Sequence, residues 1–196
     1  IFQFLNSQRE STLQPDIAVV DESSVTRHRE SDLFPLYGIQ RAYWIGTQVP
    51  ASLGGVHANF FVERQFSCQL QPFEVERAMY RVIMAQPGLR VTFTSSGHAK
   101  ILEMHDLEPW SLNVEDLRSF GGNVQSKLIK LRAKLQKDAC SYLQSAASSE
   151  KSLLFHATLI LVHETCSIMC LTWSLFVVDG YSESLFWQLL ARELNS

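Results

Sequence analysis

The fold is decided by residues 171–190, which read LTWSLFVVDGYSESLFWQLL. Residues Cys170 to Val178 are almost wholly apolar and rich in β-formers, as in a strand that is covered on both faces. Asp179 and Gly180 interrupt the apolar run, and Ser182 can act as the N-cap of a following helix. The stretch therefore predicts a strand, a tight turn and a helix. Layered α/β proteins often place catalytic groups at such a junction, although an Asp-Gly pair more commonly only makes a turn.

Composition bounds the class of protein. The chain has 196 residues, of which 46% are hydrophobic, and its net charge is -3, so it can fold as one large or two small domains with a real core. Lys and Arg are not interleaved with aromatic residues, which argues against a nucleic-acid partner. The sequence has neither a signal peptide nor an apolar run long enough to span a bilayer. We therefore expect a cytoplasmic protein that does not bind membranes.

Cysteine spacing gives no sign of a metal centre or a disulfide framework. The four cysteines lack CxxC pairing and adjacent His ligands, which favours small buried thiols. They are Cys68, Cys140, Cys166 and Cys170. We expect no metal and no cofactor.

The chain divides into two parts of different composition. Residues 1–33 are polar and irregular and are predicted to form a linker or extended arm, and the opening IFQFLNS indicates a piece of a longer polypeptide. Residues 34–196 alternate between helical and strand patterns, which predicts a domain of the α/β class with α+β layering, a mixed sheet and flanking helices.

Within that domain the expected elements follow from periodicity and turn residues. His57, in the strand after LGG, is expected to be exposed. One face of the long helix is basic, which indicates a solvated surface or a contact with an acidic partner. The expected elements are a helix from Pro72 to Gln86, strands at 89–94 and 100–104, a long helix after Asn123, a loop from Ser145 to Lys151, and a hairpin of 153–162 with 167–178.

A motif near the start of this domain resembles a known family. The segment FPLYGIQRAYWIG, residues 34–46, is similar to the FPLTxxQxAYxxGR motif of the heterocyclization domains of nonribosomal peptide synthetases. Tyr37 and Thr47 depart from it. The segment QPGLRVTF resembles the family's RHxMLRAVF, with Gln86 in place of His. The matching residues are Phe34, Pro35, Leu36, Gln40, Ala42, Tyr43, Trp44 and Gly46.

The junction at Asp179 resembles the family's signature DxxxxDxxS, which replaces the HHxxxDG of condensation domains. Asp179 and Ser182 match its second Asp and its Ser, and Ser174 stands in place of its first Asp. The resemblance implies Asp179 and Ser182 as catalytic residues. In the family, carrier-bound acyl groups are condensed with Cys, Ser or Thr and cyclized to thiazolines or oxazolines. Those proton transfers need ionisable groups, so Ser174 weakens the catalytic interpretation. We expect Ser174 to be buried or bonded locally. His156 or His163 could substitute for the missing carboxylate.

The resemblance also implies an architecture and partners. Family members resemble chloramphenicol acetyltransferase doubled into two lobes, and this chain corresponds to the N-terminal lobe. Substrates would arrive on the phosphopantetheine arms of carrier proteins, and the partners would be carrier proteins, neighbouring synthase domains, a second lobe or a second copy. Two hypotheses remain open. The chain is a degenerate, noncatalytic structural, linker or docking module of a nonribosomal peptide or polyketide synthase, or it is the N-terminal lobe of a working heterocyclization enzyme.

Overall fold

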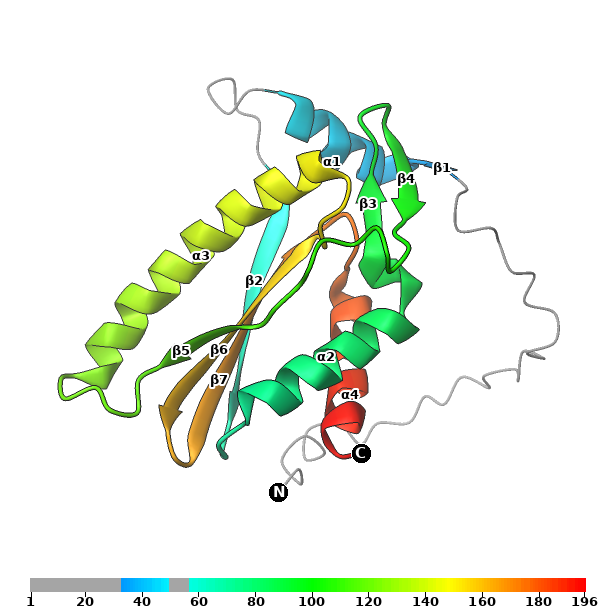
Figure 1. Cartoon of the computed structure of the whole chain (residues 1–196). Helices are drawn as coiled ribbons and strands as arrows, with labels where there is room; N and C mark the ends of the chain where they lie inside the picture. The colour runs from blue at the N-terminus through cyan, green and yellow to red at the C-terminus, as the bar shows by residue number, and fades with distance from the viewer. Residues whose placement is uncertain (1–32, 50–56) are drawn as a thin grey trace, which may run out of the picture.

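The structure, a computed structural model, describes residues 33–49 and 57–196 (Figure 1). Two β-sheets and four helices make up this part of the chain. In order, the elements are β1 (Phe34–Pro35), α1 (Gly38–Gln48), β2 (Asn59–Phe66), α2 (Pro72–Ala85), a 3-10 turn (Pro87–Arg90), β3 (Val91–Phe93), β4 (His98–Ile101), β5 (Asn113–Asp116), α3 (Val124–Ser149), β6 (Phe155–His163), β7 (Cys166–Ser174) and α4 (Gly180–Leu194).

The larger sheet has the strand order β2-β7-β6-β5. β7 pairs antiparallel with both β2 and β6, whereas β5 runs parallel to β6. A parallel pair needs a crossover connection, and α3 supplies it. The smaller sheet has the order β1-β4-β3. The prediction of a mixed sheet with flanking helices is thus confirmed.

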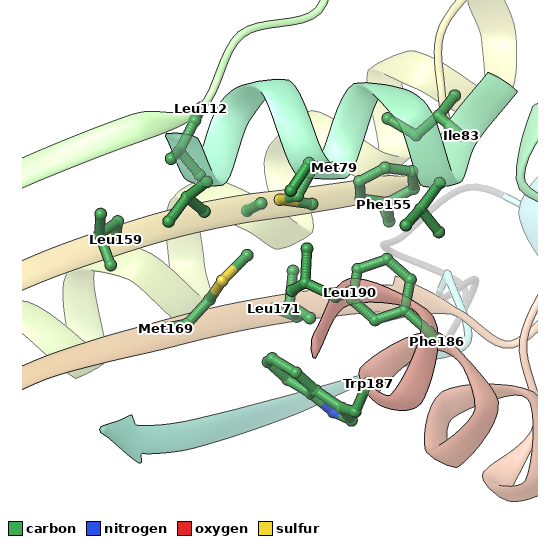
Figure 2. Packing of buried hydrophobic residues seen from close by; sticks show 14 of the residues in the cluster. Met79, Ile83, Leu112, Phe155, Leu159, Met169, Leu171, Phe186, Trp187 and Leu190 are labelled. Carbon is green, nitrogen blue, oxygen red and sulfur yellow. The ribbon is translucent and has the colours of Figure 1, made fainter. Parts of the chain in front are cut away.

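Alternation along the strands divides the core into two layers. On one face of the larger sheet, side chains of β6 and β7 pack against α2 and α4 (Figure 2). On the other face, Ile160, Ile168 and Cys170 pack against α3. Helices therefore cover both faces, which explains why β6 and β7 are buried along most of their length.

Trp173 anchors α4 to the sheet. Its side chain is fully buried, with the ring centroids of Phe155 and Phe186 at 4.9 Å and 4.8 Å. Aromatic pairs at such distances contribute about 0.5–1.5 kcal/mol beyond their buried area. The start of α4 is consequently held at the end of β7, where the polar junction lies.

The junction itself differs from the prediction in two ways. β7 ends at Ser174, and not at Val178, because the chain turns there and the Val177 N–H donates to the Ser174 carbonyl at 3.2 Å. Phe176, in that turn, is buried against the smaller sheet, where its ring lies 4.2 Å from that of Phe93. The apolar run therefore continues through a turn that is itself part of the core. The N-cap of α4 is Asp179, and not Ser182.

The long helix is also longer than expected. Asn123 caps α3 by accepting the Ser126 N–H at 2.9 Å, but the run of small residues from Ser145 continues the helix to Ser149. The loop prediction is wrong because Ala146 is buried in a third apolar cluster beside the smaller sheet. α3 ends where Glu150 adopts the left-handed conformation, at φ 56°.

The other boundaries shift by a few residues. The predicted strands at 89–94 and 100–104 form a hairpin, but as β3 and β4 they are shorter and meet at a turn closed by the Gly97 N–H. The predicted arm at 1–33 lies outside the described residues except for Leu33, and so does the LGG segment at 53–55. Among the described residues, no helix combines the length and the apolar character that crossing a bilayer requires.

Candidate functional site

Asp179 is the N-cap of α4. One of its carboxylate oxygens accepts the Ser182 backbone N–H at 2.8 Å, and the residue is exposed. This hydrogen bond lowers the pKa of Asp179 below its usual value, and the positive end of the helix acts in the same direction. The Asp179 carboxylate is therefore ionised, and it satisfies a backbone N–H in the first turn of α4. Ser182, the other residue implied as catalytic, supplies the backbone donor.

The Ser174 side chain points toward the face of the larger sheet that lies opposite α2 and α4. Because Trp173 points toward α2 and α4, the next residue of β7 points toward the other face. Its side chain is 0% exposed, and its Oγ lies 3.0 Å from Nε2 of His57 and accepts the Phe176 N–H at 3.3 Å. The expectation that Ser174 is buried is confirmed. Ser174 thus faces away from α4, the helix that Asp179 caps.

The position of His57 differs from the sequence-based expectation, which was that this residue is exposed. It is half-buried, and its ring packs against that of Phe176 at 5.7 Å between centroids. The alternation used to place it fails because β2 begins at Asn59, after His57. Its Nδ1 is shielded from solvent and has no partner among the described residues. Burial lowers the pKa of His57 below its usual value of 6.5, so the imidazole is neutral at pH 7.

A histidine bonded to a serine hydroxyl is the arrangement of a nucleophile and its base. Here, however, the Ser174 side chain is fully buried in the described part of the chain. The pair instead joins three segments: His57 before β2, the end of β7 and, through the Phe176 N–H, the turn that follows. The pair satisfies Nε2 of His57, the Ser174 hydroxyl and the Phe176 N–H, and it leaves Nδ1 of His57 without a partner among the described residues.

Neither of the other two candidate histidines lies with Asp179. His156 contacts β5 and α3. Its Nε2 lies 2.7 Å from the side-chain amide nitrogen of Asn113 in β5, and its ring lies 5.4 Å from that of Tyr142 in α3. His163 lies at the β6–β7 turn, opposite Cys166, so it is at the far end of β7 from Ser174. The hydrogen-bond partners of the two rings are Asn113 and Thr165, and neither ring is bonded to Asp179 in the described part of the chain.

One small pocket adjoins the junction. It has a volume of about 130 Å³ and lies between α2 and α4. Ser182 and Gln86 lie in its wall, and most of the rest is apolar, including Leu185 and Leu189. Asp179 is not part of the lining. The pocket can therefore hold a small apolar group next to two uncharged polar side chains, and it brings together the two motif positions Gln86 and Ser182, which are far apart in sequence.

The cysteines and acidic residues form no metal centre in this part of the chain. The four thiols are free, and no three His, Cys, Asp or Glu side chains of the described residues converge to hold an ion. Cys170 is buried against α3, and burial raises the pKa of its thiol to about 12. This thiol is therefore an inert core group.

Comparison with known proteins relates the sequence to peptide synthetases. The chain is 34% identical over 89 residues to bacitracin synthase 1 of Bacillus licheniformis, a match over 45% of this chain and 2% of that protein. It is 30% identical over 96 residues to phenyloxazoline synthase MbtB of Mycobacterium tuberculosis, over 49% of this chain and 7% of that protein. The matches thus span only a small part of these relatives' length. No family model matches the chain.

Solved structures identify the fold. The starter condensation domain of rhizomide synthetase RzmA, solved with C8-CoA and Leu-SNAC, superposes with a TM-score of 0.65 at 22% identity, over 82% of this chain and 35% of that one. The EpoB cyclization-docking bidomain from Sorangium cellulosum gives 0.64 at 19% identity, over 84% and 31%. The chain has the condensation-domain fold, related to chloramphenicol acetyltransferase, and its sequence resembles segments of nonribosomal peptide synthetases. The resemblance inferred from the motifs is confirmed at this level.

Proposed function

We propose that this chain is a degenerate, noncatalytic heterocyclization-like half domain that serves as a structural, linker or docking module in a nonribosomal peptide or polyketide assembly line. One observation carries the proposal. Ser174, at the position of the family's first Asp, is a buried core residue bonded to His57, on the face of the sheet opposite the helix that Asp179 caps.

The chemistry of heterocyclization explains why this observation matters. Condensation and loss of water require protons to move to and from an amine, a hydroxyl and a leaving water, and an ionisable group near the operating pH performs such transfers. Ser174 has no such group. His57 is neutral and its Nε2 is hydrogen-bonded to Ser174, and the Asp179 carboxylate is hydrogen-bonded at the N-terminus of α4. None of the three is free to act as a general acid or base toward a carrier-bound substrate.

The alternative is that the chain is the N-terminal lobe of a working heterocyclization domain. The pocket lined by Ser182 and Gln86 favours this alternative, because it places two positions of the family's motifs beside one cavity. Both side chains are uncharged, however, so they could orient an acyl group or a phosphopantetheine arm but could not transfer protons at neutral pH. The alternative therefore needs its acid or base from outside this chain.

The test compares the chain alone with the chain inside its full-length parent synthase. Each is incubated with acyl-loaded and aminoacyl-loaded carrier proteins, and intact-protein mass spectrometry detects the condensed product and the further loss of water. We expect no product from the chain, and no change in the parent's output when Asp179 is replaced by Asn, which removes the carboxylate and keeps the cap of α4. Deleting residues 34–196 from the parent should lower its output, because a docking module would be lost. Output that falls with Asp179→Asn but not with the matched Ser184→Ala would support the working enzyme instead.

A further inference from the structure

The outer face of α3 carries an ordered row of lysines. Lys127, Lys130, Lys134 and Lys137 are spaced three or four residues apart and all are exposed. At 3.6 residues per turn they fall within about 80° of the helix circumference and span about 15 Å along its axis. The face of α3 that carries Leu128, Leu131 and Leu135 packs against the larger sheet, about 110° around the helix from the row (Figure 1). We call these four side chains the lysine row.

The row is unusual in the charge balance of the protein. The 26 residues of α3 contain five basic side chains, the lysine row and Arg132, against one acidic side chain, Asp138, which gives +4. The whole chain has a net charge of -3, so the rest of the protein is -7. Like charges three or four residues apart destabilise a helix. The row is therefore a local concentration of positive charge on an otherwise acidic protein.

Internal partners neutralise only part of this charge. Arg132 is held by Glu63 at 2.7 Å, outside the row, and Lys134 lies 3.8 Å from Glu115. Lys127 lies over the Phe120 ring, at 5.8 Å from the centroid. Lys130 and Lys137 have no carboxylate within ion-pair distance in residues 33–49 and 57–196. Two members of the row are thus free to bind an external anion.

We propose that the lysine row is a docking surface for an acidic protein partner, one that presents carboxylates along a helix or a strand edge. The inference rests on the proposed docking role and names the surface that performs it. Oppositely charged rows steer encounter and fix register. Ile129, 59% exposed beside the row, supplies an apolar contact that a protein partner can cover.

Two other anionic partners fit less well. The apolar face of α3 is buried against the sheet, so the helix cannot insert that face into a bilayer as interfacial helices do. A nucleic acid carries phosphates along its whole length, and the net charge of -7 outside α3 repels such a long polyanion over a larger area than it repels a short acidic surface that covers only the row.

The experiment uses the full 196-residue chain and a fluorescent helical peptide with four glutamates at the spacing of the row. A matched peptide with glutamine at those positions is the control ligand. The test variant is Lys130→Glu with Lys137→Glu. The control variant, Arg77→Glu with Lys151→Glu, makes the same change in net charge at two exposed residues outside α3. Anisotropy is measured at about 50 mM and about 500 mM salt, since high salt screens surface charges.

We expect the glutamate peptide to bind the native chain at low salt, and the test variant to weaken binding about tenfold or more, with less than about threefold for the control variant. Equal affinity for native chain and test variant would overturn the proposal. So would tighter binding of single-stranded RNA or of vesicles containing phosphatidylserine than of the peptide. The binding experiment and the product assay are independent of each other. The chain can fail to bind the peptide and still be noncatalytic, and it can bind the peptide and still be an active enzyme.

Discussion

Replacing Ser174 with Ala tests its role as a core residue. The hydroxyl makes two hydrogen bonds, one with His57 at 3.0 Å and one from the Phe176 N–H at 3.3 Å. Each such bond contributes about 0.5–1.5 kcal/mol, so the variant should lose about 2 kcal/mol of unfolding free energy. For a domain of this size, that loss lowers the melting temperature by about 4–8 °C.

The assay is thermal and urea unfolding of the purified chain, with Ser184→Ala as the matched control. Ser184 is exposed on α4, where its hydroxyl bonds only to the Gly180 carbonyl at 3.2 Å, so its removal should stay within about 0.5 kcal/mol. A double-mutant cycle with His57→Ala should give a coupling energy of about 0.5–3 kcal/mol. If Ser174→Ala unfolds like Ser184→Ala and shows no coupling to His57, then Ser174 is not the buried, bonded residue described above.

Three further predictions concern the same fold. Burial lowers the pKa values of His57 and His156 below 6.5, so as the pH falls these histidines bind protons in the unfolded chain before they do in the folded chain. The free energy of unfolding should therefore be highest above pH 6.5 and should fall as the pH drops below it. A urea midpoint that stays constant from pH 7.5 to 5 would contradict this. Asp179→Ala should lower the melting temperature and Asp179→Asn should largely restore it, because Asn also caps helices; equal melting of both with the native chain would indicate an idle carboxylate. Gly97→Ala should cost about 1–2 kcal/mol, since φ is +77° and a Cβ would meet the Trp44 ring at 3.1 Å, whereas Gly88→Ala, with open space around it, should be near neutral in the same melts.

Local signals predicted much of the fold. The Asp179-Gly180 break, the hairpin of β6 and β7, and the start of α3 after Asn123 were predicted from turn residues and local periodicity, because these signals act over a few neighbouring residues. The resemblance of FPLYGIQRAYWIG to a family motif added the architecture. Such signals depend only on neighbours in the sequence.

Contacts between distant segments could not be predicted in the same way. The end of β7 at Ser174 depends on Phe176 turning toward Phe93, which lies more than 80 residues earlier in the chain. The burial of Ala146 keeps a run of small residues helical for the same kind of reason. Apolar composition shows that a residue is buried, but not against which element.

The candidate site shows this limit most clearly. That Ser174 departs from the family motif is visible in the sequence, but its partner His57 is not, because nothing local indicates that β2 pairs with β7 with Asn59 opposite Ser174. An ideal strand from 174 to 179 would put the two side chains on different faces, but β7 ends at Ser174, so its alternation does not reach Asp179. Only the position of α4 shows that the second residue caps a helix in the other layer.

The most direct test of whether the two motif positions act together is to restore the family's carboxylate. Ser174→Asp is introduced into the full-length parent synthase, which is incubated with carrier-bound acyl groups and carrier-bound cysteine, serine or threonine. Intact-protein mass spectrometry then measures the condensed product and the loss of water. We predict no product from this module in either the native or the Ser174→Asp parent, because residue 174 lies in the layer opposite Asp179. Product that forms in the Ser174→Asp parent and disappears with Asp179→Ala would contradict the noncatalytic role.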